Sequence, residues 1–503
     1  MVTGTMQETP LARRLTGVGA TIFSEMSALA REHGAVNLGQ GFPDFPGPDW
    51  VKEAAKRAID QEINQYAISH GAVSLRQQLA VHAGRQLNRE IDSDTEIVVT
   101  SGATEAIFAG ILGLVDPGDE VIVFEPFYDS YVPAVQFAGG WCRFVPLRPP
   151  DDEHPQWWFD ADELASAFTE RTRLLLLNTP HNPTGKVYTR DELQLIAHLC
   201  QQWNVYVLSD EVYEHILFDD CEHLSIGSLP GMWERTLTVS SAGKTFSLTG
   251  WKIGWSIAPA ELNAAVRGTH QFVVFCSAAP LQEGIAAGLR EANARGYYAD
   301  LRAMYQAKRD LLVDALEDAG LRPYRPEGTY FVLCDISHLG FDDDVAFCRY
   351  LTTQVGVTAI PPSFFYSPEH KQMGRQLARF AFCKQDATLR DAAQRLLDWR
   401  GNDGSDVLAG HQLAAGLEEV EAAVTEVVMP RVDFDMKEGA VIRWLVESGS
   451  TVKNGDPLAD IETHKIVIQL KAPAGGILEI KAAAGEAVPV GGIIAVISAT
   501  GES

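Results

Sequence analysis

Residues 240–255 read SSAGKTFSLTGWKIGW, and this stretch decides the fold of the first 400 residues. Lys244 follows a β-type run and a turn of small residues, and Lys252 comes eight positions later. Lysines at such spacing are often ordinary surface charge. Here they are bracketed by Gly243, Gly250 and Gly254, which indicates a loop that binds a cofactor.

Short apolar runs alternate with helix-period segments on both sides of this loop, from about residue 30 to residue 260. The runs EIVVT, EVIVF, LLLLN, VYVLS and RTLTVSS are separated by segments such as ATEAIFAGILGLV and ELQLIAHLCQQW. This alternation predicts βαβ units around a mostly parallel sheet, whose ligands gather at the C-terminal strand ends. Residues 286–400 predict a second α/β unit with a long helix, the strands TYFVLCDI and RFAFCK, and a closing helix.

With these motifs in this order, residues 15–400 resemble the fold-type I pyridoxal-phosphate (PLP) aminotransferases of class I/II. The resemblance implies an aminotransferase domain over 1–400. Its large PLP-binding domain would span about 45–285, and its small domain about 15–44 plus 286–400. The chemistry explains the residue types, because PLP needs a lysine amine, a carboxylate at its ring nitrogen and donors around its phosphate.

The resemblance assigns a role to each polar residue of these motifs. Lys244 would bond covalently to the cofactor and later move a proton at the substrate Cα. Asp210 would pair with the ring nitrogen, although an isolated aspartate after a strand is equally a helix cap. The remaining cofactor contacts would come from Tyr213 and Asn182 at the ring oxygen, Gly102, Ala103, Thr104, Ser241 and Lys252 at the phosphate, and Phe127 on the ring face.

The placement of SGATEA, residues 101–106, independently indicates an anion site, because it joins the strand EIVVT to a helix whose N-terminal amides are free. The resemblance makes that anion the cofactor phosphate. The resemblance also implies that Tyr66 contacts the cofactor phosphate bound by a neighbouring subunit, and therefore that the protein is a homodimer with shared sites.

Fewer residues of the sequence indicate how the substrate is recognised. Arg379 in RFAFCK would grip the substrate α-carboxylate by a bidentate fork, beside Asn182. Residues 21–45 resemble a subgroup that includes kynurenine, glutamine, methionine and succinyl-diaminopimelate aminotransferases, in which Phe23, Gly39 and Phe275 would line the pocket. No second substrate-binding arginine is evident, which favours aromatic, sulfur-containing or glutamine-like donors over aspartate. Cys276 stands where some of these relatives carry histidine.

A different pattern begins after Arg400. Residues 401–424 mix Gly, Asp, Ser, Ala and Glu and predict a solvated linker. From 425 to 500, short β-type runs alternate with turn residues, which predicts an all-β domain. Within it, the two segments that end in GSTVKNGDPL and GEAVPVGGII are predicted to be quasi-repeated hairpins.

This tail resembles a lipoyl/biotinyl domain, which implies a flattened barrel of two sheets with a modified lysine at a hairpin tip. Thr463 and Lys465 fit the lipoyl pattern better than the biotin pattern, while His464 replaces the aspartate common before the lysine. We therefore expect a lipoyl-lysine at Lys465, with a lipoate ligase or a 2-oxo acid dehydrogenase component as partner. The alternative is an unmodified lysine in a docking module.

Net charge and cysteine content limit which partners and which cellular compartment are expected for this chain. A net charge of -26 disfavours nucleic acid and anionic membranes as partners. Seven scattered cysteines with no C-x-x-C pair indicate a reducing compartment, no metal site and no disulfide framework. No apolar export segment or 18-residue apolar run is present, so a cytoplasmic protein is expected.

These observations together predict a cytoplasmic, dimeric, PLP-dependent L-amino acid:2-oxo acid aminotransferase. A PLP-dependent β-lyase acting on sulfur-substituted amino acids shares every cofactor residue. A carrier or scaffold built around the tail is a further alternative, and the intact set of PLP residues argues against it. A PLP-binding transcription regulator would need a basic DNA-reading domain, which this acidic chain does not show.

Overall fold

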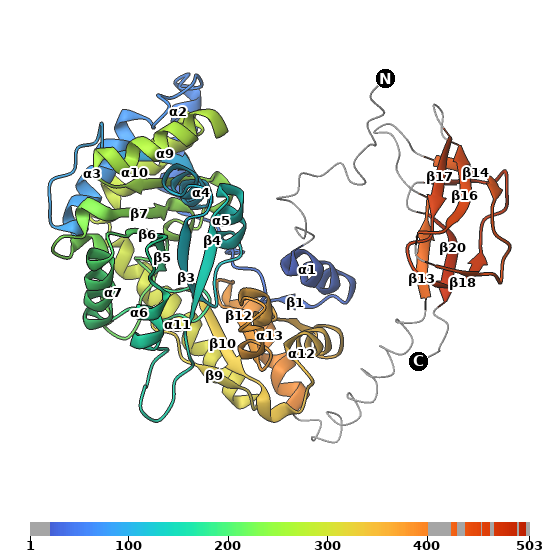
Figure 1. Cartoon of the computed structure of the whole chain (residues 1–503). Helices are drawn as coiled ribbons and strands as arrows, with labels where there is room; N and C mark the ends of the chain where they lie inside the picture. The colour runs from blue at the N-terminus through green and yellow to red at the C-terminus, as the bar shows by residue number, and fades with distance from the viewer. Residues whose placement is uncertain are drawn as a thin grey trace. The chain divides into compact units, whose positions relative to one another are not determined.

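Figure 1 shows the computed structural model of the chain, which describes residues 21–400, 424–429, 438–453, 455–462, 467–489 and 492–498. The chain divides into two compact units, Met1–Asp403 and Gly404–Ser503. None of the helices in these ranges combines the length and apolar character that a membrane crossing requires.

A seven-stranded sheet forms the centre of the first unit. Its strands, in spatial order, are β2 (Ile97–Ser101), β8 (Ile253–Ile257), β7 (Thr236–Ser241), β6 (Tyr206–Asp210), β5 (Thr172–Asn178), β3 (Glu120–Glu125) and β4 (Trp141–Pro146). All neighbours are parallel except β8, which runs antiparallel to β2 and to β7. The predicted mostly parallel α/β sheet is confirmed, with β4 and β8 as strands that the sequence analysis did not assign.

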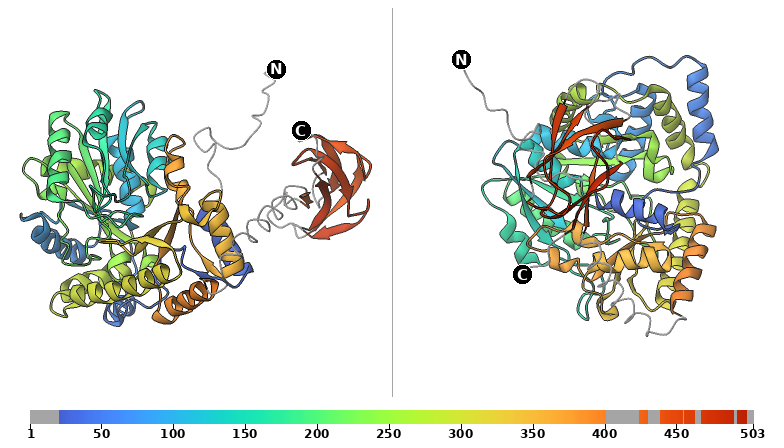
Figure 2. Two further views of the ribbon diagram at one scale, coloured as in Figure 1. Left: turned by 90° about the horizontal axis from the view of Figure 1, so that it is seen from below. Right: turned by 90° about the vertical axis from the view of Figure 1, so that its right-hand side faces the viewer.

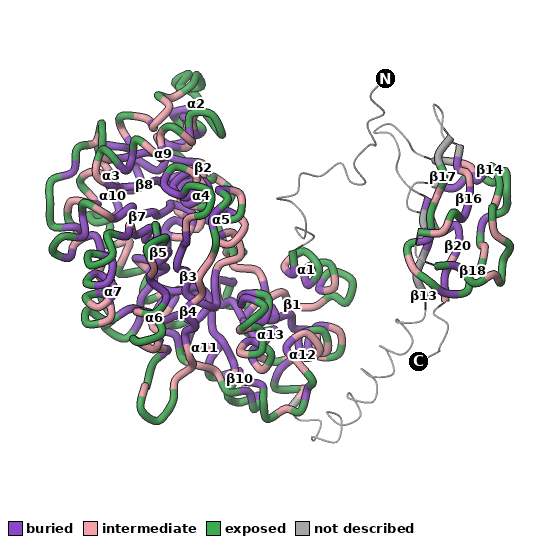
Figure 3. The backbone as a smooth tube through the Cα atoms, in the orientation of Figure 1, coloured by how far each residue is buried: buried purple, intermediate pink, exposed green. Residues whose placement is uncertain are grey.

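Helices cover both faces of this sheet, which explains why its strands are continuous apolar runs rather than alternating ones. Ile122, Leu175 and Val207 pack on one face, and their neighbours Val121 and Leu174 pack on the other. The helices involved are α4 (Gly102–Leu114), α5 (Tyr131–Ala138), α6 (Ala161–Ala167), α7 (Arg190–Gln202) and α9 (Ala260–Val273). Figure 3 shows the strands of this sheet buried along most of their length, except the edge strand β4, of which only the last two residues are buried.

A third cluster of buried residues surrounds β2 and β8 at the end of the sheet. It is built from α2 (Asp49–Asp60), α3 (Val73–Leu87) and α10 (Ala279–Ala292), whose buried faces include Val51, Leu79 and Ile285. Trp255 of β8 lies at its centre and is only 2% exposed.

The smaller part of the first unit contains a three-stranded antiparallel sheet in the order β12 (Leu377–Ala381), β10 (Phe331–Asp335) and β9 (Arg322–Tyr324). Two helices, α11 (Tyr297–Asp318) and α13 (Asp386–Arg400), pack side by side (Figure 2). The predicted helix near 343–355 is α12 (Asp344–Tyr350), continued by a π-helical turn over Leu351–Val355.

The N-terminal segment joins this smaller part. Helix α1 (Ile22–Glu32) is followed by β1 (Val36–Asn37), which pairs in parallel with β11 (Val357–Thr358). Leu38 continues the contact by accepting a hydrogen bond from the backbone N–H of Ala381 at 2.6 Å. This pairing delivers residues 39–42 to the edge of the cavity described below.

The second unit consists of two four-stranded antiparallel sheets over one apolar core. One sheet has the order β13 (Val424–Val428), β20 (Ile493–Ser498), β18 (Gly476–Ile480) and β15 (Thr451–Val452). The other has the order β17 (Val467–Lys471), β16 (Pro457–Glu462), β14 (Glu438–Trp444) and β19 (Ala487–Pro489). The predicted all-β tail is confirmed.

The two quasi-repeated segments occupy equivalent places, and each contains the antiparallel strand pair of the predicted hairpin, β14 with β16 in the first and β18 with β20 in the second. β15 pairs with β18 in one sheet, whereas β16 pairs with β14 and β17 in the other. β19 pairs with β14 in the second of these sheets, and β20 pairs with β18 in the first. Each segment therefore crosses from one sheet to the other, because its strands are needed to close both edges of the core. Gly449 and Gly485 make matching turns, with φ of 93° and 87°.

Candidate active site

A cavity of about 370 Å³ lies where β2, β5, β6 and β7 end. These strands run in the same direction, so their C-terminal ends meet at one edge of the sheet, where ligands of open α/β sheets bind. Most predicted site residues line this cavity: Phe23, Gly102, Ala103, Thr104, Asn182, Asp210, Tyr213, Ser241, Lys244, Lys252 and Arg379.

Lys244 lies on the short helix α8 (Ala242–Thr245) that follows β7. Its Nζ donates a hydrogen bond of 2.7 Å to the hydroxyl of Tyr330 and a longer one of 3.4 Å to the carbonyl of Gly41. Burial disfavours the charged ammonium and lowers the pKa of Lys244 to about 8. At pH 7 about one tenth of this amine is therefore neutral and able to act as a nucleophile and base, far more than for an exposed lysine.

Asp210 closes β6 and is buried at the floor of the same cavity. The hydroxyl of Tyr131 donates to Asp210 Oδ2 at 2.6 Å, a short charge-assisted hydrogen bond. Burial nevertheless raises the pKa of Asp210 to about 6. A protonated ring nitrogen beside this carboxylate would favour its ionised form further.

The start of α4 forms an anion cradle with Lys252. Gly102 has φ of 78°, and a Cβ placed there would lie 3.0 Å from Lys252 Nζ. The missing side chain leaves room for an anion between the free amides of the helix and the ammonium. Gly254 packs against this turn so closely that a Cβ would lie 2.4 Å from the carbonyl carbon of Gly102. The hydroxyls of Thr104, Ser241 and Thr249 complete the lining.

Arg379 lies opposite the anion cradle, on β12, and only 3% of it is exposed. Its Nη2 donates to the carbonyl of Gly39 at 2.8 Å, while Nε has no hydrogen-bond partner in the described structure. The guanidinium lies 4.2 Å from the ring centre of Phe331 and 5.1 Å from that of Phe23. Burial lowers the pKa of Arg379 to about 10, so it stays cationic at neutral pH.

The prediction for Phe127 is wrong, because this side chain does not line the cavity. Phe127 is 8% exposed and stacks on Phe144 in the core, with ring centres 5.6 Å apart. The next residue, Tyr128, lines the cavity instead. Neighbouring side chains of an extended segment point to opposite sides, so an error of one position exchanges the core residue for the site residue.

Two predicted substrate residues also lie outside the cavity lining. Gly39 contributes only its carbonyl to Arg379, because its Cα faces Ile360, whose Cδ1 would lie 2.9 Å from an added Cβ. Phe275 is 47% exposed and contacts Tyr66, which is 83% exposed, with ring centres 5.2 Å apart. The two rings form an exposed aromatic pair at the surface.

Several cavity residues were not predicted. Tyr131 and Asp129 belong to EPFYDSY, and Tyr330, which contacts Lys244, is the second residue of the predicted strand TYFVLCDI, so these segments were noted but their polar residues were not assigned. Gln40 and Gly41 enter the lining only because β1 pairs with β11, which no local pattern signals.

The arrangement fits a bound PLP. The cavity holds an amine, a buried carboxylate and an anion cradle, which are the three groups that the cofactor requires. The open cradle at Gly102 and the unpaired Nε of Arg379 leave donors for a phosphate and for a carboxylate.

The predicted modification site lies outside the described residues, which omit 463–466 and with them Thr463, His464 and Lys465. On either side, β16 and β17 pair antiparallel with Glu462 opposite Val467.

Comparison with known proteins identifies both parts of the chain. The family described as Aminotransferase class I and II matches residues 34–396, and the family described as Biotin-requiring enzyme matches residues 425–497. The kynurenine–oxoglutarate transaminase of Dictyostelium discoideum is 43% identical over 415 residues, covering 77% of this chain and 95% of that protein. The methionine aminotransferase of Escherichia coli is 43% identical over 383 residues, covering 76% and 97%.

The structure of N-succinyldiaminopimelate aminotransferase from Mycobacterium tuberculosis is similar, with a TM-score of 0.74 and 46% identity over 77% of this chain and 100% of that one. The predicted PLP-transferase fold is thereby confirmed. The chain belongs to the class I and class II aminotransferases and carries a C-terminal domain of the biotin/lipoyl type.

Proposed function

We propose that this aminotransferase uses PLP bound in the cavity to transfer the amino group of an aromatic, sulfur-containing or glutamine-like L-amino acid to a 2-oxo acid. When bound, PLP supplies an electron-withdrawing ring that acidifies the substrate Cα–H. The residues of the chain hold the reactants and move the proton.

Lys244 is placed to be the base. Its pKa of about 8 lets the amine accept a proton near neutral pH and return it in the second half of the cycle. Tyr330 holds Nζ at 2.7 Å and is itself anchored to the carbonyl of Gly41 at 2.6 Å. The segment around Gly41 therefore positions the amine through Tyr330.

Asp210, Asn182 and Tyr213 would hold the cofactor ring in its plane. Asn182 is fixed by its backbone N–H, which donates to Asn178 Oδ1 at 2.7 Å. Asn178 in turn donates to the backbone carbonyl of Asp210 at 2.9 Å. This chain of hydrogen bonds links the ends of β5 and β6 and limits the movement of the ring-binding groups.

The buried Arg379 carries the proposal for an amino-acid substrate. It is a cation with an unpaired donor in the same cavity as Lys244, and it suits a bidentate bond to an α-carboxylate. Among the residues that line the cavity, Arg379 is the single arginine. The rings of Phe23 and Phe331, 5.1 and 4.2 Å from the Arg379 guanidinium, also line the cavity, and these aromatic walls favour a donor with a large apolar or sulfur-containing side chain.

A panel of amino donors with one 2-oxo acid acceptor tests this function. We expect kynurenine, methionine and phenylalanine to exceed aspartate in kcat/KM. Arg379→Lys should depress all donors alike, and exposed Arg375→Lys is the matched control. Comparable activity with aspartate would contradict the substrate class. Pyruvate and ammonia released without an oxo acid would support the β-lyase alternative instead.

The same site supports a homodimer. Phe272, Val273 and Phe275 are 85%, 52% and 47% exposed, beside Tyr66 at 83%. Such an exposed apolar surface suits contact with a partner subunit, whose phosphate Tyr66 would reach. Sedimentation equilibrium should show a dimer that Tyr66→Ala or Phe272→Ala weakens and Trp141→Ala, at an exposed residue of β4, does not. A monomeric parent protein would contradict the proposal.

We further propose that the tail carries lipoate on Lys465 and links transamination to 2-oxo acid oxidation, because a transaminase makes 2-oxo acids and a tethered module raises effective concentration. Peptide mass mapping of protein from its own host should find lipoyl on Lys465, absent in Lys465→Arg and retained in the control Lys481→Arg. A chain ending at Gly404 should lose co-purification with a 2-oxo acid dehydrogenase component. An unmodified Lys465 would leave a docking module.

A further inference from the structure

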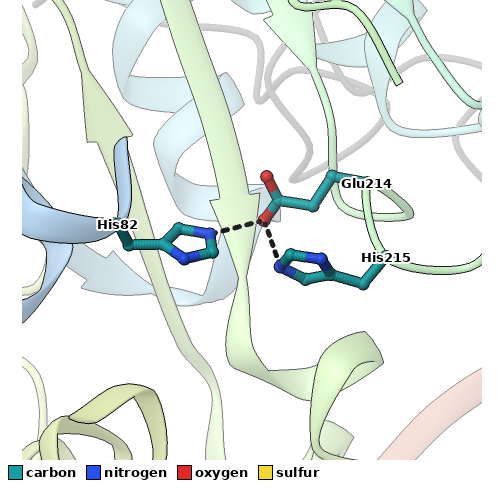
Figure 4. A group of neighbouring side chains, drawn as sticks. All are labelled: His82, Glu214 and His215. Carbon is teal, nitrogen blue, oxygen red and sulfur yellow. Dashed lines mark ion pairs between the residues drawn. The ribbon is translucent and has the colours of Figure 1, made fainter. Parts of the chain in front are cut away.

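Behind the cofactor cavity lies a buried cluster of two histidines and one glutamate that the aminotransferase chemistry does not use. His82 comes from α3, while Glu214 and His215 come from the turn that follows Tyr213. Their side chains are 11%, 4% and 13% exposed, respectively. Figure 4 shows both imidazole rings directed at the same carboxylate.

The carboxylate of Glu214 does not supply hydrogen-bond partners for the two imidazoles. Nε2 of His82 and Nε2 of His215 each lie 3.8 Å from Glu214 Oε1, beyond hydrogen-bonding distance. Both Nε2 atoms are buried without a hydrogen-bond partner among the residues that the structure describes. Because buried polar atoms are normally paired, two unpaired nitrogens facing one oxygen indicate a missing group between them.

The separations suit a metal ion. One ligand atom from each residue lies within 4.8 Å of the others. In a tetrahedral zinc site, metal–ligand distances of about 2.1 Å place the ligand atoms about 3.4 Å apart. The two nitrogen–oxygen separations of 3.8 Å are a few tenths of an ångström longer than this, and the two imidazole nitrogens lie within 4.8 Å of each other.

Neighbouring residues already orient the carboxylate as the outer groups of a metal site do. Gln86 Nε2 donates to Glu214 Oε2 at 2.5 Å, and the hydroxyl of Ser240 donates to Oε1 at 2.8 Å. The ring of His215 is fixed by stacking on Tyr298, with centres 4.0 Å apart. Glu211, on the same turn, adds a second buried carboxylate, paired with His223 at 2.7 Å.

We propose that Nε2 of His82, Nε2 of His215 and an oxygen of Glu214 bind one divalent first-row transition metal ion of the Zn²⁺ type. Two imidazoles and one carboxylate favour such an ion over Mg²⁺ or Ca²⁺, which prefer oxygen ligands. The fourth position is left to a water molecule. The ion fixes the turn that carries Asp210 and Tyr213 to α3, so its role is structural.

Equilibrium dialysis of the full-length, PLP-loaded protein against Zn²⁺, followed by elemental analysis, tests the site. We expect His82→Gln and His215→Gln each to bind one Zn²⁺ per chain fewer than the parent protein. The matched control is His270→Gln, at a buried histidine whose two ring nitrogens are paired with Glu105 at 2.6 Å and with the Ser69 carbonyl at 2.7 Å. It should bind as many ions as the parent.

Two measurements on the unaltered protein keep the test independent of whether the variants fold. Co²⁺ should give the visible absorption of a tetrahedral site, and Zn²⁺ should raise the thermal midpoint by several degrees where Mg²⁺ does not. Absence of the Co²⁺ absorption, or the same zinc stoichiometry in the parent and in a folded His82→Gln variant, would overturn the proposal.

Discussion

The hydrogen bond between Tyr131 and Asp210 makes a sharp prediction about cofactor binding. At 2.6 Å to a buried carboxylate it is charge-assisted, and such bonds contribute about 1.5–3 kcal/mol. One pKa unit corresponds to about 1.4 kcal/mol. Tyr131→Phe should therefore raise the pKa of Asp210 in the cofactor-free protein from about 6 to about 7–8.

The direction of the effect on affinity follows from linkage. Ionised Asp210 pairs with the cofactor ring nitrogen, so affinity for PLP falls as pH drops through the pKa of Asp210 in the free protein. For the parent protein the fall begins near pH 6, where the pKa lies. For Tyr131→Phe it begins about one to two units higher, which makes binding about 2- to 10-fold weaker at pH 7 and nearly unchanged at pH 9.

The stability of the cofactor-free protein should also depend on the pKa of Asp210. A carboxyl group whose pKa is raised by folding stabilises the protein at low pH, and this contribution is lost as pH rises from 3.8 to about 6. In Tyr131→Phe the loss continues to about pH 7–8. The free energy of unfolding should thus be lower by about 1 kcal/mol at pH 7, and by about 1.5–3 kcal/mol at pH 9, where the loss is nearly complete.

The assay is a titration of cofactor-free protein with PLP between pH 5 and 9, followed by absorbance or fluorescence. Tyr188→Phe is the matched control, because the Tyr188 hydroxyl is also buried but has no hydrogen-bond partner in the described part of the chain. Its affinity curve should coincide with that of the parent protein. Identical curves for Tyr131→Phe and the parent would refute the reasoning.

Three further predictions concern the same cavity. Arg379→Lys should lower kcat/KM for amino donors by about 10- to 150-fold, because the lost fork is worth about 1.5–3 kcal/mol; an unchanged kcat/KM would contradict a carboxylate role. Gly254→Ala should lower the free energy of unfolding by about 1–3 kcal/mol in urea, since its Cβ would lie 2.4 Å from Gly102. Gly268→Ala, with open space around it, should not be destabilised. The rate of PLP attachment to Lys244 should rise with pH with its midpoint near 8, where burial places the pKa, and level off about one unit above it; a midpoint near 10.5 would contradict the burial argument.

Helices and strands could be predicted where a single property of the local sequence, such as a continuous apolar run, determined them. The strands LLLLN and VYVLS are buried on both faces of a parallel sheet, so continuous apolar runs identify them. The strand β8 was not predicted, because IGWSI contains a glycine and a serine and lies within the segment that predicts a cofactor loop. Its place in the sheet depends on antiparallel pairing with β2 and β7, which are distant in sequence.

Local sequence patterns were enough to predict the class of chemistry. Lys244, Asp210 and the turn at Gly102 follow strand ends, and strand ends of one parallel sheet must meet at one edge. The residues that surround these groups could be identified only from the folded chain. Tyr128 rather than Phe127 faces the cavity, and Tyr330 reaches Lys244 across 86 positions of sequence. His82 likewise meets Glu214 through the packing of α3, because side-chain direction and long-range packing are set by the whole fold and not by local pattern.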